Sequence, residues 1–280
     1  MLEVIKYEGL KNGKNLLILG AIHGNEVCGP KAITNIIKKI KNNEIKIKTG
    51  SVTFIPICNL EAYKQNKRYI NINLNRIFEK IENPKNNEEI ISQKIIKYID
   101  ECDYLLDIHS IHSEGPSFAF LDKDTEEEMK KFVIIQNFQS IIVGWNDIFG
   151  KNDKSTCGYA LKYNKICTTI ECGNHNDPLC IERAETAIKN SLAFLDIADC
   201  ELSFDKNNQK FIKMEKVFYK EKEGYFVKNW KHLDTIKSEE IIAKYNDGEV
   251  IKAKKDCLII MPHEDNPIGT EWFYLGKYIN

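Results

Sequence analysis

The feature that most constrains the fold is an alternation, over the first two hundred residues, between short β-branched apolar runs and longer segments of helical periodicity. This pattern predicts strands at residues 15–22, 51–57, 104–108, 117–121, 140–143 and 166–170. It predicts helices at residues 26–40, 87–101, 125–138, 156–163 and 179–197. Such alternation is typical of an α/β fold with a mixed, mostly parallel sheet flanked by helices. Ligands bind these sheets at the carboxyl ends of strands, so polar residues there are candidate site residues.

The pattern changes after about residue 201, where charged and apolar residues alternate over short distances. The segments 216–219, 224–227 and 257–261 read as short strands, separated by Asn246-Asp247-Gly248 and by Pro262. A chain of 280 residues also exceeds the usual length of one domain, about 150 residues. We therefore expect a catalytic domain over residues 1–200 and a small β-rich domain over residues 201–280.

The composition argues against several classes of function. With 40 basic and 41 acidic side chains the chain lacks the broad basic field of a nucleic-acid binder. Its apolar runs are far shorter than the about 18 residues of a membrane span, and its first residues show no signal-peptide pattern. The nine cysteines form no Cys-x-x-Cys pair, which favours reduced thiols. We expect a cytoplasmic protein with no nucleic-acid or membrane partner, and the sequence leaves homo-oligomerisation open.

Two candidate metal ligands stand where the first predicted strand gives way to the first helix. The segment Gly20-Ala21-Ile22-His23-Gly24-Asn25-Glu26 places an imidazole and a carboxylate three residues apart. At that spacing both side chains can converge on one small divalent ion. The simpler interpretation is a buried histidine hydrogen-bonded to a glutamate at the start of a helix.

Two further predicted strands end in residues of the same chemistry. One apolar run leads into Asp107-Ile108-His109-Ser110, and another leads into Ile170-Glu171-Cys172-Gly173. Two histidines and one carboxylate bind zinc in several metallohydrolases, with the fourth position left open. A second carboxylate, outside the ligand set, is what such a site needs as its base. The three strand ends together predict a hydrolytic metal centre.

A third segment, residues 66–76, contains two of the only three arginines in the chain, Arg68 and Arg76. Because lysine is the default cation of this sequence, an arginine here suggests a use for its planar, bidentate side chain. A guanidinium can donate to an oxyanion, or it can bind a substrate carboxylate with help from a neighbouring amide. Two arginines in a surface loop are the alternative.

In their order, these motifs resemble the aspartoacylase/succinylglutamate desuccinylase family, relatives of zinc carboxypeptidases. The resemblance is carried by HGNE at 23–26, the Asn59-x-x-Ala62 start, the RYI…NLNRIF run at 68–78, DIHS at 107–110 and IECG at 170–173. It implies a zinc carboxypeptidase-like sheet in the first domain, followed by the family's small β domain. It also implies a zinc-dependent deacylase that hydrolyses the amide bond of a small, anionic N-acyl amino acid.

The resemblance also assigns roles to individual residues. It implies one Zn²⁺ per chain, bound by His23, Glu26 and His109. Glu171 would be the general base that takes a proton from the attacking water. Arg68 would polarise the scissile carbonyl and stabilise the oxyanion, while Asn75 and Arg76 would bind the α-carboxylate of the amino acid.

The sequence departs from the family pattern in two places. Asn73 replaces the usual aspartate before Leu-Asn-Arg, which removes a charge that could orient Arg76. No arginine lies near residues 156–164 to bind a side-chain carboxylate, and only Lys162 and Lys165 are basic there. Specificity for acyl-aspartate is therefore not implied.

Other interpretations remain open. Ser110 follows His109 as in true carboxypeptidases, so a carboxypeptidase acting on a short peptide is the main alternative. A metal-binding protein without catalysis is a second, and intact Glu171 and Arg68 argue against it. We expect His112 at the rim of the site rather than among the ligands. A nucleophilic pair of Cys172 and His175 is disfavoured, because nothing else marks this thiol as activated.

Overall fold

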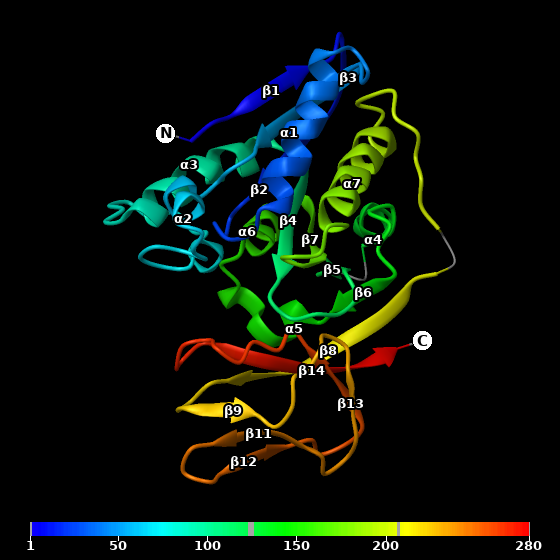
Figure 1. Ribbon diagram of the computed structural model, residues 1–280. Coiled ribbons are helices and arrows are strands. Elements are labelled where there is room, and N and C mark those ends of the chain that lie inside the picture. Colours follow the sequence, from blue (N-terminus) through cyan, green and yellow to red (C-terminus); the bar gives the residue numbers. More distant parts are fainter. Residues whose placement is uncertain (1, 123–125, 206–207, 280) are drawn as a thin grey trace.

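The computed structural model describes residues 2–122, 126–205 and 208–279, and its elements confirm the α/β class (Figure 1). The strands are β1 (Ile5–Glu8), β2 (Lys11–Gly20), β3 (Thr49–Ile55), β4 (Tyr104–Ile111), β5 (Phe118–Leu121), β6 (Ser140–Val143), β7 (Ile166–Asn174), β8 (Lys210–Tyr219), β9 (Gly224–Phe226), β10 (Thr235–Ile236), β11 (Ile241–Tyr245), β12 (Val250–Lys252), β13 (Cys257–Ile260) and β14 (Glu271–Ile279). Within the described residues, eleven of them form one sheet in the order β1-β3-β2-β4-β7-β5-β6-β8-β14-β13-β10. The others form a small sheet in the order β12-β11-β9.

Helices cover both faces of the large sheet. They are α1 (Cys28–Lys41), α2 (Leu60–Lys64), α3 (Asn87–Glu101), α4 (Glu127–Ile134), α5 (Trp145–Phe149), α6 (Thr156–Lys162) and α7 (Cys180–Phe194), with 3-10 turns η1 (Leu74–Arg76) and η2 (Gly150–Asn152). Helices α1 and α7 pack together across β4 (Figure 1). Cys172 of β7 interacts with Cys28 of α1, whereas Thr169 contacts Cys157 of α6. Because residues of opposite parity point to opposite faces of a strand, α6 covers the other face. None of the described helices is both long and apolar enough to cross a membrane.

The centre of the sheet is parallel, with β4 between β2 and β7. Every residue of β4 is buried, as expected for a strand covered on both faces. The register pairs Asp107 with Thr169 and His109 with Glu171. It therefore brings two of the predicted site residues side by side at the carboxyl edge.

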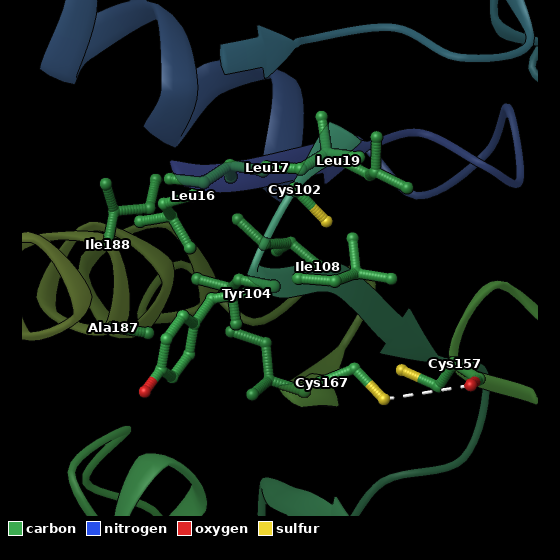
Figure 2. Close-up of a cluster of buried hydrophobic side chains, with 14 of the residues drawn as sticks. Leu16, Leu17, Leu19, Cys102, Tyr104, Ile108, Cys157, Cys167, Ala187 and Ile188 are labelled. Atoms are coloured by element: carbon green, nitrogen blue, oxygen red, sulfur yellow. Dashed lines mark hydrogen bonds between the residues drawn. The ribbon is translucent and has the colours of Figure 1, made fainter. Parts of the chain in front are cut away.

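The core beneath this edge is built from aliphatic side chains of the central strands and of α7. Figure 2 shows β2, β4, β7 and α7 contributing to it through Leu16, Leu17, Leu19, Tyr104, Ile108, Cys167, Ala187 and Ile188. In the same view the thiol of Cys167 lies 3.7 Å from the carbonyl oxygen of Cys157 in α6. Close packing of this kind fixes the strands against one another, so the residues at their ends hold defined positions.

The C-terminal segment both extends the large sheet and forms the small one. Strand β8 pairs in parallel with β6, and β14 pairs antiparallel with β8 along most of its length. The small sheet packs against this extension around Phe226, Trp230 and Trp272. Residue 200, the predicted domain boundary, falls in the connection between α7 and β8, where one sheet continues across it (Figure 1).

The predicted elements correspond to observed ones throughout the first two hundred residues. The ranges 87–101 and 140–143 coincide with α3 and β6, and most others differ by a few residues at their ends. The helix predicted at 125–138 is the shorter α4, and Thr125 lies outside the described residues. Strand β1 and helices α2 and α5, each four or five residues long, are not predicted.

The loop that carries the two site arginines is held by a single buried carboxylate, Glu88. Its oxygens accept the backbone N–H groups of Ile70 and Asn71 at 2.8 and 3.3 Å, and the side-chain amides of Asn71 and Asn59 at 3.1 and 3.3 Å. Burial works against ionisation, but these hydrogen bonds prevail and lower the pKa of Glu88. The ionised carboxylate therefore fixes the loop between β3 and α3.

We predict that Glu88→Ala lowers the free energy of unfolding by about 1–3 kcal/mol for each donor left without a partner. Since the folded-state pKa lies below the ordinary value of 4.5, this stabilisation is present above pH 4.5 and is lost as the pH falls through the folded-state value. Urea unfolding of wild type and Glu88→Gln across this range tests the sign. An equally steep loss of stability in both proteins would exclude Glu88 as the titrating anchor.

Candidate metal centre and active site

The loop between β2 and α1 is folded so that His23 and Glu26 face the same point. Ala21, directly after β2, is fully buried in the left-handed region at φ 46°, which turns the chain sharply. A Cβ atom on Gly24 would lie 2.1 Å from the backbone of Ala62, so only glycine fits against α2. The Glu26 N–H then donates to the His23 carbonyl at 3.2 Å. The HGNE sequence therefore produces a compact turn.

The three predicted metal ligands lie together in the interior. His23 Nδ1 is 2.8 Å from Glu26 Oε1, and His109 Nδ1 is 2.8 Å from Glu26 Oε2. One ligand atom from each of the three lies within 4.8 Å of the others. All three side chains are at most 2% exposed. His23 and Glu26 thus form the buried hydrogen bond of the simpler interpretation, and the same atoms could hold an ion.

The charge states of the trio His23, Glu26 and His109 favour the binding of a cation. Burial raises the pKa of the Glu26 carboxyl, but the charges of His23 and His109 and their hydrogen bonds lower it well below its ordinary value. Burial, followed by the Arg68 guanidinium, lowers the pKa of His23 to about 4. For His109 burial acts in the same direction, but Asp107 and Glu26 outweigh it and raise its pKa. An ionised carboxylate and a neutral imidazole are therefore present, and His109 would release a proton on binding a metal.

The second ring nitrogen of each histidine, Nε2, lies close to a side-chain oxygen that orients the ring. His109 Nε2 lies 2.9 Å from Asp107 Oδ2, although outside hydrogen-bond alignment, and Thr156 Oγ1 donates to the same oxygen at 2.5 Å. His23 Nε2 lies 3.0 Å from Asn73 Oδ1. These contacts direct both Nδ1 atoms at Glu26, as partners of metal-binding histidines do. Asn73, the departure from the family pattern, therefore lies behind His23, whereas the Arg76 side chain is paired with Glu271.

Neither Asp107 nor Thr156 is among the site residues predicted from the sequence. The sequence does point to Asp107, because it stands two residues before His109 and residues two apart on a strand share one face. Thr156 has no such signal, since it comes from the first turn of α6, 49 residues away.

Glu171 lies beside His109 across the β4–β7 pair and projects into the same cavity. Its side chain is 8% exposed, and its Oε2 atom is buried without a hydrogen-bond partner among the described residues. Burial raises the pKa of Glu171 to about 8, against the opposing charge of His109. A carboxyl group in this state can exchange protons close to neutral pH.

The remaining predicted residues surround the trio on its open side. Arg68 Nη1 lies 3.0 Å from Glu26 Oε1, and its side chain is 34% exposed. Asn75 is buried, and its Oδ1 accepts the Thr156 N–H at 3.0 Å. Arg76 donates through Nε and Nη2 to Glu271 Oε1 at 3.0 and 2.9 Å. An acidic residue of β14, not predicted from the sequence, therefore orients the arginine.

One cavity of about 120 Å³ connects these groups. Of the seven predicted site residues it is lined by six, His23, Arg68, Asn75, Arg76, His109 and Glu171. The seventh, Glu26, lies behind the two histidines. The C-terminal segment closes the opposite wall with Met261, Pro262, His263, Asn266, Glu271 and Tyr274. The site is therefore complete only when residues beyond 200 are included.

The weaker candidates take up other positions. His112 lines the rim, stacked on His263 at 4.0 Å between ring centroids and beside His175 at 4.4 Å. His175 Nδ1 lies 2.7 Å from the Ser110 hydroxyl. Cys172 follows Glu171 and so points to the opposite face of β7, towards Cys28. A Cys172–His175 pair is not formed.

Comparison with known sequences places residues 12–198 in the succinylglutamate desuccinylase/aspartoacylase catalytic domain. The chain is 29% identical to a probable aspartoacylase from Prochlorococcus marinus over 153 residues, which cover 55% of this chain and 44% of that protein. It is 35% identical to a succinylglutamate desuccinylase from Pseudomonas fluorescens over 77 residues, covering 28% and 22%. The aligned regions thus span less than half the length of these two relatives.

Solved structures share the fold over nearly the whole chain. Succinylglutamate desuccinylase from Vibrio cholerae matches with a TM-score of 0.80 at 17% identity, covering 99% of this chain and 86% of that one. A product-bound ectoine utilization protein from Ruegeria pomeroyi matches with a TM-score of 0.80 at 18% identity, covering 98% and 88%. These likenesses establish the architecture, and the match over residues 12–198 establishes the ancestry: the chain belongs to the succinylglutamate desuccinylase/aspartoacylase family.

Proposed function

We propose that this protein is a zinc-dependent deacylase that hydrolyses the amide bond of an N-acyl amino acid. The observation that carries the proposal is the grouping of the buried His23–Glu26–His109 trio with an unpartnered Glu171 oxygen beside one cavity. Membership of the family supports the same class of reaction.

The donor set fits a zinc ion. The trio offers two imidazole nitrogens and one carboxylate oxygen, which are typical ligands of catalytic zinc. Zn²⁺ bound by His23, Glu26 and His109 would polarise the substrate carbonyl and make a water molecule more acidic. The oxygens behind both rings support this assignment, because they fix the nitrogens in one orientation.

The residues around the trio have separate roles in proton transfer, carbonyl polarisation and substrate binding. In the proposed reaction a C–O bond to water forms and the amide C–N bond breaks. Glu171 takes up the proton of the attacking water and delivers it to the leaving nitrogen, which departs as an amine. Arg68 donates hydrogen bonds to the carbonyl oxygen as negative charge develops on it. Asn75 and Arg76 bind the α-carboxylate and so hold the scissile bond in place.

A carboxypeptidase acting on a short peptide is the second candidate. It is favoured by a second groove of about 520 Å³ that shares Arg68, Arg76 and His263 with the cavity and could receive the rest of a peptide. The deacylase is favoured by the C-terminal segment, since Met261 and Pro262 lie over the cavity and limit the length of a substrate.

A substrate screen separates these candidates. The zinc-loaded protein would be assayed against acetyl-, succinyl- and formyl-amino acids beside short peptides, each with a chelator control. We expect release of free amino acid from an acyl-amino acid, and loss of that activity with the chelator. Hydrolysis of peptides alone would favour the carboxypeptidase, and hydrolysis of neither would support a metal-binding protein without catalysis.

We also propose a reducing compartment such as the cytoplasm. All nine cysteines have free thiols, and eight of them are buried. Three of the thiols, those of Cys28, Cys172 and Cys180, interact with one another without forming a disulfide. Unpaired cysteines in this number are usual where thiols are kept reduced.

We predict that Asp107→Asn lowers the affinity for Zn²⁺ by about 10- to 100-fold, because the charge that supports His109 is removed. Competition with a chromogenic chelator measures the change. Asp147→Asn, the same replacement at an exposed residue of α5, is the control. Equal zinc affinity in wild type and Asp107→Asn would show that this carboxylate does not support the ligand.

We predict that Glu171→Gln retains one Zn²⁺ per chain but lowers kcat by about 10²- to 10⁴-fold, since the amide cannot accept the proton. Metal analysis and steady-state kinetics on the same sample provide both values. Full activity in this variant would remove Glu171 from the mechanism.

The two arginines should differ in their kinetic effects. Arg68→Ala should lower kcat by about 10²- to 10³-fold, because its contact strengthens only as the oxyanion forms. Arg76→Ala should mainly raise KM, because its contact is present in the ground state as well as in the transition state. Arg76→Lys serves as a second variant that keeps a cation beside Glu271. The reverse assignment of kcat and KM effects would contradict the proposed roles.

A further inference from the structure

The cavity beside Glu171 is also lined by Asp122, which follows β5. On β7, Thr169 shares the face of Glu171, and both line the cavity. The antiparallel register sets Phe118 of β5 opposite Glu171, so Phe120 and Asp122 follow on the same face. At about 3.3 Å per residue, Phe120 lies about 7 Å further along the strand direction than Phe118, and Asp122 follows directly after the end of β5. The pocket therefore reaches from Glu171 to Asp122.

The end of this pocket is acidic. Asp122 lines it, and within the described parts of the chain its carboxylate has no hydrogen-bond or ion-pair partner. A second carboxylate, Asp153, is buried nearby and accepts the N–H and hydroxyl of Ser155 at 2.9 and 3.0 Å. Burial, and then the charge of Asp153, raise the pKa of Asp122 to about 7. No cation of the described residues therefore pairs with Asp122 when it is ionised. A positively charged group of a ligand could take that place.

The walls above the acidic end are aromatic. Trp145 packs against Phe120 with ring centroids 5.3 Å apart and against Tyr274 at 5.9 Å, and all three line the cavity. Aromatic faces bury the methylene stem of a long side chain and attract a cation at its end. The aromatic walls and the acidic end therefore both favour a side chain with an apolar stem and a positive charge at its end.

Both basic residues of the site already have carboxylate partners, and the guanidinium of Arg76 also lies over the Trp145 ring, 5.4 Å from its centroid. Arg68 is beside Glu26 and Arg76 is paired with Glu271, and no other arginine or lysine among the described residues lines the cavity. Lys162 is exposed at the end of α6, and Lys165 donates to the Asp100 carbonyl at 2.8 Å. An acidic substrate side chain at the end of this pocket would meet two carboxylates, and the cation beside its aromatic wall, Arg76, is already paired with Glu271.

We propose that this pocket receives a cationic amino-acid side chain, with Asp122 as the residue that selects it. The substrates would be Nα-acyl amino acids whose side chain ends in an ammonium or guanidinium group, such as lysine. This inference rests on the proposed deacylase function, because Asn75 and Arg76 must hold the α-carboxylate for the side chain to point towards Asp122. It separates this chain from relatives named for aspartate or glutamate derivatives.

A matched set of substrates tests the proposal. The zinc-loaded enzyme would be assayed with the lysine, norleucine and glutamate derivatives of the acyl group it accepts, since norleucine has the lysine stem without the charge. We expect kcat/KM for the lysine derivative to exceed that for norleucine by about tenfold to a hundredfold. In Asp122→Asn this ratio should fall towards one, and the exposed control Asp147→Asn should keep it. A ratio near one in wild type, an unchanged ratio in Asp122→Asn, or a preference for glutamate would overturn the proposal.

A binding measurement keeps this test separate from the test of the function. Calorimetric titration with free L-lysine, L-norleucine and L-glutamate, the products expected of each substrate, needs no turnover. Tighter binding of lysine in wild type but not in Asp122→Asn supports the pocket assignment even if no acyl derivative is hydrolysed. Equal binding of lysine and norleucine contradicts the assignment, even if the enzyme proves to be a deacylase.

Discussion

The site depends on one carboxylate, that of Glu26, which contacts both histidines and Arg68 within 3.0 Å. An anion at 1% exposure is stable only when it is paired, and here three side chains pair with it. Those side chains come from the loop after β2, the end of β4 and the loop before η1. Glu26 therefore ties together three distant segments, and a divalent cation among the same atoms would supply the charge that such an anion requires.

The C-terminal segment is part of the site because the sheet continues into it. Pairing of β8 with β6 brings β14 alongside, and β14 then places Glu271 against Arg76 and Tyr274 against Trp145. Arg76 is oriented by a residue 195 positions away. A family match that ends at residue 198 does not include this contribution, so the shape of the cavity follows from the whole chain.

The parts predicted from the sequence are those with local signals. Apolar periodicity places the buried strands, and polar residues at their ends identify His23, Glu26, His109 and Glu171, because parallel strands bring their carboxyl ends to one edge. Only residues 216–219 of β8 are predicted, since its charged residues alternate on a half-exposed surface, and β14 is not predicted although it contains the buried aromatic run Trp272-Phe273-Tyr274. Glu271, Thr156 and Asp122 join the site only through pairings between distant segments, and these leave no local pattern.

X-ray absorption spectroscopy of the zinc-loaded protein tests the central claim most directly. We predict one Zn²⁺ per chain with only nitrogen and oxygen neighbours, two of them imidazole nitrogens at about 2.0–2.1 Å. The buried thiols of Cys28 and Cys172 lie on the far side of the same strands, so a misassigned site would be revealed by sulfur at about 2.3 Å. Sulfur ligation, or the absence of bound zinc, would contradict the assignment of His23, Glu26 and His109.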